Sequence, residues 1–252
     1  MLICWAIFGR MSAIVEQSFW NGFWQGKQLD YDERSILFTD LFDRFLPKTG
    51  TCFEVGCFPG NFLVYLARRF GYRVSGIDYV PDAREHMRAY LERLGCQVDD
   101  LFFEDFLRFT PTGRYDVVCS FGFVEHFENL KAVLAKHVEL VAPGGTLVVS
   151  CPNFRYVQYM LHWMLDRTNL RRHVIPVMNL RRWTSILRSQ GMEILHAGYY
   201  RTFDFWYDQP VSRLQARIGS RVHRVAQKLD RWVHLPNRFT SPYMIAIARK
   251  RQ

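Results

Sequence analysis

The sequence predicts an α/β protein with a doubly wound, mostly parallel sheet of seven strands and helices on both faces. Strand-like runs alternate with helical stretches of 10–15 residues, the pattern of βαβ units. The segments VVCSF (117–121) and TLVVS (146–150) are almost continuously apolar, as buried central strands are. A glycine-containing turn, CFPGN at 57–61, separates the first strand from a helix, as in nucleotide-binding α/β proteins.

The first half of the chain provides three strands with a helix after each of the first two. Residues 12–47 look helical, since apolar positions in 35–46 recur at helical spacing, and Pro47 and Gly50 end the helix. Gly71 and Gly95 close the next two helices, and Pro81 suits a helix start. The expected order is strand 51–56, helix 61–70, strand 73–78, helix 82–94 and strand 97–103.

The second half continues the alternation and then changes character. We expect a strand at 115–121, a helix at 128–141 stopped by Pro143-Gly144-Gly145, and a strand at 146–151. An aromatic stretch follows. The remaining expected elements are a helix at 179–190, a strand at 192–200, a basic helix near 211–232 and a last strand at 243–249.

Size and composition favour one domain with one large core. The chain has 252 residues, of which 49% are hydrophobic. The apolar residues 1–10 are too short to span a bilayer and lack a positive flank, and no run reaches 18 uncharged apolar residues. We therefore expect a cytoplasmic protein that is not integral to a membrane. The six cysteines form no C-x-x-C pair and suggest buried thiols in a reducing compartment; they stand at 4, 52, 57, 96, 119 and 151.

The turn after the first strand indicates an adenosine-type cofactor. Asp78 follows Gly56 by 22 residues, at the end of the second strand, and a carboxylate there can accept hydrogen bonds from both ribose hydroxyls. The turn does not suit a pyrophosphate, because Phe58 replaces the middle glycine of G-x-G-x-x-G and Glu54 would repel it. No P-loop motif is present. A cofactor with ribose, adenine, an amino acid and a sulfonium fits better than NAD or ATP.

These motifs resemble those of class I S-adenosylmethionine-dependent methyltransferases, in order and at the usual spacing over about residues 30–205. The matching segments are EVGCFPG (54–60), Asp78, YDVVCSFGFVEHF (115–127) and LVAPGGTLVVSCPNF (140–154). The segments at 121–126 and 143–153 are most similar to enzymes that methylate sugars, glycans and lipid-linked or natural-product substrates. The resemblance implies a Rossmann-like sheet whose last two strands form an antiparallel hairpin at the edge.

The same resemblance divides one methyltransferase domain, 1–252, into three parts. Residues 1–47 would form a helical cap, 48–151 the cofactor-binding core, and 152–252 a substrate-side lid with the edge hairpin and the basic helix. S-Adenosyl-L-methionine is the expected cofactor.

Nine residues are candidates for holding this cofactor. Gly56 and Gly60 would let its methionine part lie against backbone, and Glu54, by resemblance, would help to hold the ammonium group. Asp78 would bind the ribose, and Tyr79 would lie against the adenine. Asp105, with Glu104 as the competing acid, would accept from the adenine amino group. Phe106 would offer its ring face, and Ser120 and Phe121 would contact the methionine part.

His126 is the candidate catalytic base, with Glu125 as its orienter. A hydroxyl acceptor loses a proton on methylation, and imidazole is a suitable base. Alternatively, the Glu-His pair has a structural role only, at the start of the following helix and bound to backbone or core groups. Ubiquinone-pathway O-methyltransferases, which this segment resembles, carry a metal site of the form E-x-x-E-H. Here Gly122 stands at the first position, and two ligands make a poor site. We therefore expect metal-independent chemistry.

The acceptor would be enclosed by aromatic residues, although these residues also suit an ordinary core. The candidates are Phe19, Trp20, Phe23 and Trp24 near the N-terminus, and Tyr156, Tyr159 and Trp163 in the segment 154–163.

The net charge of +9 is concentrated near the C-terminus. Residues 211–238 contain seven Arg or Lys and one acid. Apolar positions form one face of the expected helix, namely Val211, Leu214, Ile218, Val222, Val225, Leu229 and Trp232. This profile suits peripheral contact of 211–233 with anionic lipid, and equally a helix packed on its own domain. A carrier phosphate on a lipid-linked glycan would also satisfy the charge.

The leading interpretation is O-methylation of a sugar, glycan or related hydroxylated metabolite. The acceptor would then be a small molecule or a glycan, either free or linked to a lipid. An RNA or nucleic-acid methyltransferase is an alternative, disfavoured because strand 115–121 is followed by no N/D-P-P-Y loop. A non-catalytic cofactor-binding protein and a dehydrogenase are the remaining alternatives.

Overall fold

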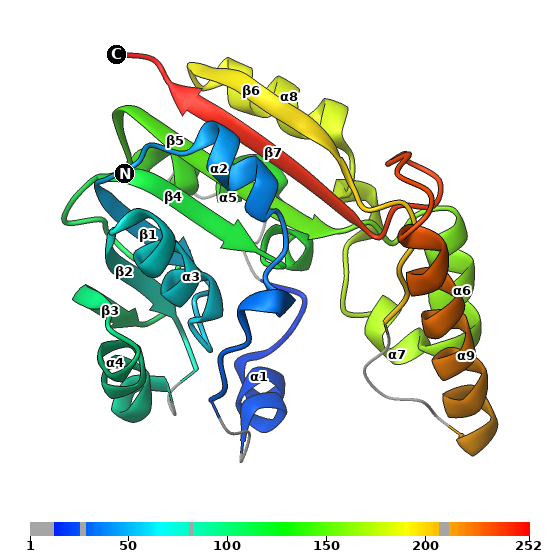
Figure 1. The fold of residues 1–252 in the computed structure, drawn as a ribbon. Helices are drawn as coiled ribbons and strands as arrows, with labels where there is room; N and C mark the ends of the chain where they lie inside the picture. The colour runs from blue at the N-terminus through cyan, green and yellow to red at the C-terminus, as the bar shows by residue number, and fades with distance from the viewer. Residues whose placement is uncertain (1–12, 26–28, 81–82, 207–211) are drawn as a thin grey trace, which may run out of the picture.

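The structure is a computed structural model that describes residues 13–25, 29–80, 83–206 and 212–252. Its centre is a seven-stranded sheet in the order β3-β2-β1-β4-β5-β7-β6 (Figure 1). The strands are β1 (Thr51–Val55), β2 (Arg73–Asp78), β3 (Gln97–Phe103), β4 (Tyr115–Phe121), β5 (Val141–Pro152), β6 (Met192–Tyr200) and β7 (Tyr243–Lys250).

The sheet is parallel except at β7. The pairs β1–β2, β1–β4, β2–β3 and β4–β5 are parallel, whereas β7 runs antiparallel to β5 on one side and to β6 on the other. The last strand therefore inserts between β5 and β6. This confirms the predicted fold class, including the antiparallel hairpin at the edge.

Helices cover both faces of the sheet. The helices of the described residues are α1 (Gln17–Trp24), α2 (Thr39–Phe45), α3 (Asn61–Phe70), α4 (Ala83–Arg93), α5 (Leu130–Leu140), α6 (Val157–Leu165), α7 (Arg167–Leu170), α8 (Leu180–Ser189) and α9 (Arg213–Asp230). One core cluster holds the inner sides of α2, α3 and α4, and the other holds those of α5 and α8. Short 3-10 turns lie at Glu33–Ser35, Val124–His126 and Ile175–Val177.

Side-chain caps explain several of the helix starts. The side-chain oxygen of Asn129 accepts from the N–H of Ala132 at the start of α5, and that of Asn179 accepts from Arg181 and Arg182 at the start of α8. Such caps satisfy backbone donors that have no partner inside the helix.

Two elements differ from the sequence-based expectation. The expected helical stretch 12–47 is broken within the described residues: α1 ends at Trp24, and α2 begins only at Thr39. Directly before α2, Phe38 adopts a left-handed backbone with φ of 66° while its ring is buried against Tyr200. Strand β5 begins at Val141, before the glycines expected to precede it. A Cβ on Gly145 would lie 3.0 Å from the carbonyl oxygens of Tyr115 and Asp116. The absence of that Cβ lets β5 approach β4 early.

The described cysteines fit the expectation of free thiols. Cys52, Cys57, Cys96, Cys119 and Cys151 are unpaired and buried. The sixth, Cys4, lies outside the described residues. Within the described part of the chain, no helix combines the length and apolar content that crossing a bilayer requires.

Candidate functional site

A cavity of about 550 Å³ lies at the carboxyl ends of β1, β2 and β4. In open α/β sheets this edge is where ligands bind. We call it the donor cavity. Of the predicted cofactor residues, its wall contains Gly56, Asp78, Tyr79, Asp105, Phe106 and Phe121.

The turn after β1 is held against the end of β2. The backbone N–H groups of Gly56 and Cys57 both donate to the carbonyl of Ile77, at 2.8 and 3.2 Å. Gly56 has a φ of +73°, and a Cβ there would lie 2.8 Å from Cδ2 of Phe123. Only glycine fits this backbone and this spacing without a shift. The ends of β1, β2 and β4 therefore meet at the cavity wall.

Asp78 is tied into the same turn through both carboxylate oxygens. Oδ2 accepts from the N–H of Phe58 at 3.0 Å, and Oδ1 accepts from the N–H of Val80 at 3.1 Å. Burial raises the pKa of Asp78 to about 6, although these backbone donors oppose the rise. The side chain is therefore a carboxylate at neutral pH, oriented by the backbone and placed on the cavity wall.

The predicted adenine contacts gather at the end of β2 and after β3. The Tyr79 hydroxyl donates to the carbonyl of Val15 at 3.3 Å, which ties it to the N-terminal segment. Oδ1 of Asp105 accepts from the N–H of Leu107 at 2.9 Å. Phe106 is buried and contacts Phe123 edge-on, with ring centroids 5.6 Å apart. Glu104, the competing acid, also lines the cavity.

Three predicted cofactor residues lie behind the wall. Gly60 is buried where α3 begins, with a φ of +95°. Ser120 and Glu54 are buried within β4 and β1, and neither is among the residues that line the donor cavity. Burial, followed by the charges of Cys52 and Asp78, raises the pKa of Glu54 well above its usual value. Glu54 is therefore close to the site without reaching its surface.

A second cavity of about 300 Å³ adjoins the first. We call it the acceptor cavity. Trp20, Phe121, Gly122 and His126 line both cavities. The remaining wall is largely aromatic and includes Phe23, Phe38, Phe62, Trp206 and Tyr243, with polar residues Glu125, Asn169, Arg172 and His173.

The N-terminal segment closes the junction of the two cavities. The N–H of Ile14 donates to the carbonyl of His126 at 2.9 Å, and the Trp20 ring lies edge-on to the His126 ring at 5.2 Å. Trp24 contacts Phe58 in the same way at 5.1 Å. Trp20 and Phe23, two of the aromatic residues expected to enclose the acceptor, thus line the second cavity.

His126 lies at this junction, and a backbone carbonyl fixes its ring. Its Nδ1 lies 2.7 Å from the carbonyl oxygen of Arg172, so Nδ1 carries the proton and Nε2 keeps its lone pair. Burial lowers the pKa of His126 to about 4, which the carbonyls of Arg172 and Gly122 oppose. The ring is neutral at pH 7. Its orientation comes from the Arg172 carbonyl and not from Glu125, the orienter expected from the sequence.

Glu125 is buried beside His126 and keeps an oxygen without a hydrogen-bond partner among the described residues. Burial raises its pKa to about 8, so the carboxyl is mostly protonated at pH 7. Together Glu125, His126 and His173 offer three ligand atoms within 4.8 Å of one another. Only Glu125 and His126 were expected as possible metal ligands from the sequence, because His173 lies 47 residues further along the chain.

The outer aromatics are placed differently from the expectation. Tyr156, Tyr159 and Trp163 are 42%, 44% and 48% exposed, and none of them lines the donor or the acceptor cavity. The reason is that α6 turns Gln158 and His162 inward and these rings outward. The acceptor cavity is lined instead by residues that the sequence did not indicate, namely Asn169, His173 and Trp206. No local motif marks them.

The chain belongs to a known family. A family model described as "Methyltransferase domain" matches residues 30–197. The chain is thus a class I S-adenosylmethionine-dependent methyltransferase, as its motifs suggested, and S-adenosylmethionine is the methyl donor of that class.

Several curated relatives are methyltransferases with small-molecule acceptors in their names. Trans-aconitate 2-methyltransferase of Methylobacterium radiotolerans is 30% identical over 124 residues, covering 48% of this chain and 46% of that protein. The 2-methyl-6-phytyl-1,4-hydroquinone methyltransferase of Synechocystis is 36% identical over 114 residues, covering 44% and 34%. The chain thus matches about half the length of these relatives or less.

Solved structures share the fold. A putative sarcosine dimethylglycine methyltransferase from Galdieria sulphuraria superposes with a TM-score of 0.58 at 15% identity, covering 93% of this chain and 98% of that one. The N-methyltransferase NodS from Bradyrhizobium japonicum, in complex with S-adenosyl-L-homocysteine, has a TM-score of 0.50 at 16% identity, with 81% and 80% covered. At such identities the likeness concerns the fold alone.

Proposed function

We propose that this protein transfers a methyl group from S-adenosylmethionine in the donor cavity to a hydroxyl oxygen of a molecule in the acceptor cavity. The observation that carries the proposal is the junction of the two cavities at Phe121, Gly122 and His126. Methyl transfer is an in-line displacement, so a donor and an acceptor held on opposite sides of one junction gain most from orientation.

The donor cavity suits this cofactor in both shape and charge. Asp78 has two oxygens that each already accept one backbone N–H, and a carboxylate has about four lone-pair sites in all. About two sites remain for the ribose hydroxyls. Tyr79 and Phe106 offer aromatic surface for the adenine, and Asp105 offers an acceptor for its amino group. Glu54, behind the wall, would act on the ammonium group through water.

When bound, S-adenosylmethionine supplies a methyl group on a positively charged sulfur. The backbone at Phe121 and Gly122 would position this end against the acceptor cavity, and Gly56 would let the methionine part lie close to the turn. Nε2 of His126 would accept the proton that the acceptor hydroxyl loses when its oxygen takes the methyl group and S-adenosylhomocysteine is left. The Arg172 carbonyl accepts a hydrogen bond from Nδ1 of that ring and so fixes its orientation.

The acceptor cavity favours a hydroxylated molecule with apolar or ring surface. Its walls are mainly aromatic, and aromatic faces suit sugars and rings. Glu125 Oε2 and Asn169 Nδ2 are buried there without partners among the described residues. Unpaired buried polar atoms are costly unless a ligand satisfies them. We propose a sugar, a glycan or a related hydroxylated metabolite.

The substitution His126→Ala tests the role of the base. General-base catalysis contributes about 10²–10⁴-fold, so turnover should fall by about that factor while calorimetric affinity for S-adenosylhomocysteine stays within about threefold. The control is His86→Ala, an exposed histidine on α4, which should leave both unchanged. Turnover of His126→Ala close to wild type at every pH would exclude the base role.

We further propose that the reaction needs no metal, with His126 rather than an ion removing the proton. Turnover should be unchanged after treatment with a chelator. The contrary result would be a loss of turnover that a divalent ion restores in the wild-type protein but not in a His173→Ala variant. It would assign Glu125, His126 and His173 to that ion.

A further inference from the structure

Exposed large apolar side chains are concentrated in one part of the chain. Among the described residues, every exposed large hydrophobic side chain except Ile14 lies between positions 156 and 239. They come from α6, α9 and the segment that follows α9. These residues, which we call the outer apolar surface, are Tyr156, Val157, Tyr159, Met160, Trp163, Met164, Leu214, Ile218, Val225, Leu229, Trp232, Leu235 and Phe239. Val211, placed on this face by the sequence, lies outside the described residues.

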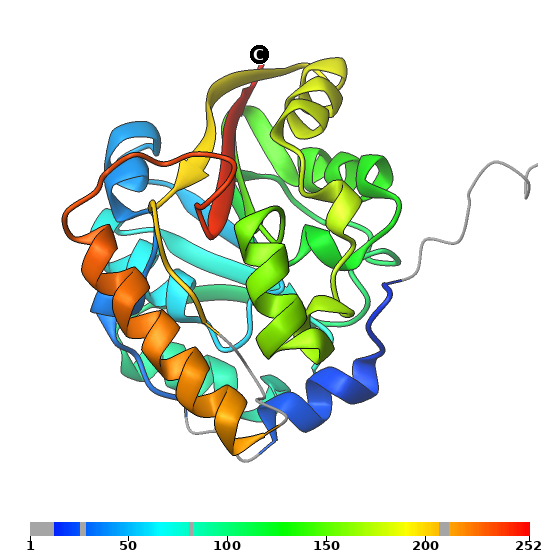
Figure 2. The same ribbon diagram turned by 90° about the vertical axis from the view of Figure 1, so that its right-hand side faces the viewer.

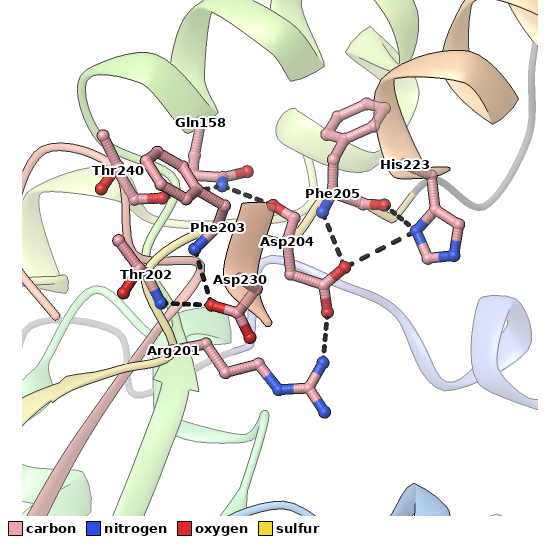
Figure 3. A network of polar contacts seen from close by, with 9 residues as sticks. All are labelled: Gln158, Arg201, Thr202, Phe203, Asp204, Phe205, His223, Asp230 and Thr240. Atoms are coloured by element: carbon pink, nitrogen blue, oxygen red, sulfur yellow. Dashed lines mark hydrogen bonds and ion pairs between the residues drawn. The ribbon is translucent and has the colours of Figure 1, made fainter. Parts of the chain in front are cut away.

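Helix α9 is attached to the protein through polar groups rather than through its apolar face (Figure 3). Asp230 accepts from the N–H groups of Thr202 and Phe203, at 2.7 and 3.0 Å. Nδ1 of His223 contacts the carbonyl of Phe205 at 2.5 Å and lies 3.6 Å from Asp204. Meanwhile, Leu214 is 67% exposed and Val225 is 58% exposed. The helix therefore turns much of its apolar side toward solvent, which a helix packed on its own domain does not do.

Helix α6 belongs to the same surface. The two helices lie side by side (Figures 1 and 2), and Nε2 of Gln215 on α9 donates to the carbonyl of Met164 on α6 at 3.0 Å. From the inner side of α6, Gln158 Nε2 donates to the carbonyls of Asp204 and Thr240 at 2.8 and 3.2 Å. The polar network thus fixes α6 and α9 as one platform with apolar side chains outward.

The platform carries unneutralised positive charge. Arg213, Arg217, Arg221, Arg224, Lys228 and Arg231 are exposed on or directly after α9. Within the described ranges none of them forms an ion pair with a carboxylate. An exposed apolar face flanked by arginine, with a tryptophan at its end (Trp232 is 82% exposed), has the profile of a helix that lies in a lipid interface.

We propose that α6, α9 and residues 232–239 dock this protein on an anionic bilayer surface. The outer apolar surface enters the boundary between headgroups and acyl chains, and the basic residues meet lipid phosphates. A self-associating interface accounts less well for the surface, because two copies would bring their basic rows together.

The docking surface lies directly behind a wall of the acceptor cavity. His162, on the inner side of α6, packs on Phe154 and Trp206 with ring centroids 4.1 and 5.6 Å away, and Trp206 lines that cavity. Resting on the proposed function, this placement favours an acceptor whose hydroxylated head enters the acceptor cavity while its lipid part stays in the bilayer.

The test is cosedimentation of the full chain with vesicles of phosphatidylcholine, with and without added phosphatidylglycerol. We expect binding only to the anionic vesicles. The triple variant Arg217→Glu, Arg221→Glu, Arg224→Glu should weaken partitioning about tenfold or more, and Trp232→Ser should weaken it as well. The matched control, Arg114→Glu, Lys131→Glu, Arg188→Glu, has the same charge change at exposed sites elsewhere and should bind within about twofold of wild type.

Three outcomes would overturn the docking surface. Wild-type protein could remain in the supernatant with anionic vesicles, the two triple variants could lose binding equally, or Trp232→Ser could convert a dimer of this chain into a monomer. Vesicle binding is measured without methyl transfer, so it separates the two proposals. Binding without any methylation of lipid or free acceptor would contradict the proposed function and leave the docking surface standing.

Discussion

Removing the Asp78 carboxylate should weaken donor binding far more than it affects folding. The side chain has about two acceptor sites left for ribose after Phe58 and Val80 have used theirs. Hydrogen bonds to a charged group are worth about 1.5–3 kcal/mol each. The loss of two therefore amounts to about 3–6 kcal/mol, which is a factor of about 10²–10⁴ in Kd.

The assay is calorimetric titration of Asp78→Ala with S-adenosylhomocysteine, accompanied by thermal unfolding of the ligand-free protein. Burial raises the pKa of Asp78 to about 6, so the charged form is disfavoured in the folded protein, and its removal offsets the two lost backbone contacts. We expect the free energy of unfolding to change by no more than about 1 kcal/mol.

Asp100→Ala is the matched control, since Asp100 is an exposed carboxylate on the neighbouring strand β3. It should bind the ligand like wild type. A Kd for folded Asp78→Ala within about threefold of wild type would refute the assignment of the ribose to this carboxylate.

Two further predictions concern the same wall. In the proposed role, donor binding requires the ionised form of Asp78, whose pKa of about 6 lies above its ordinary value. Affinity for S-adenosylhomocysteine should therefore be constant above pH 7 and fall toward tenfold per pH unit below pH 6. A pH-independent affinity between pH 4.5 and 7 would contradict this. Gly56→Ala forces a Cβ to within 2.8 Å of Phe123 at a positive φ, so it should weaken ligand binding by about 5–150-fold. Gly113→Ala, where a Cβ meets open space, should bind and melt like wild type.

Local sequence signals identified most of the sheet and the donor cavity. Strands 73–78, 97–103 and 115–121 have the predicted bounds. The last contains a buried apolar run, whereas 97–103 is a partly exposed edge strand that was located by the glycine that ends the helix before it. Gly56 and Asp78 could be named because their roles depend on backbone geometry at strand ends, which spacing along the chain reveals.

The residues that line the acceptor cavity could not be predicted from local sequence signals. His173, Asn169 and Trp206 reach it through the packing of segments after β5, and their neighbours in sequence carry no motif. The outward turn of Tyr156, Tyr159 and Trp163 had the same cause, since periodicity marks the face of a helix but not what that face contacts. For α9 the sequence located most of the apolar face, but it did not show that this face points outward. The exposure of Leu214 and Val225 and the polar anchors at His223 and Asp230 show that.

The most direct test of the account is a crystal structure with S-adenosylhomocysteine and a hydroxylated acceptor analogue. We predict both ribose hydroxyls within hydrogen-bond distance of Asp78, the sulfur at Phe121 and Gly122, and the acceptor oxygen between that sulfur and Nε2 of His126. A structure in which the nucleoside lies elsewhere, or in which the acceptor cavity is separated from the sulfur by protein, would contradict it.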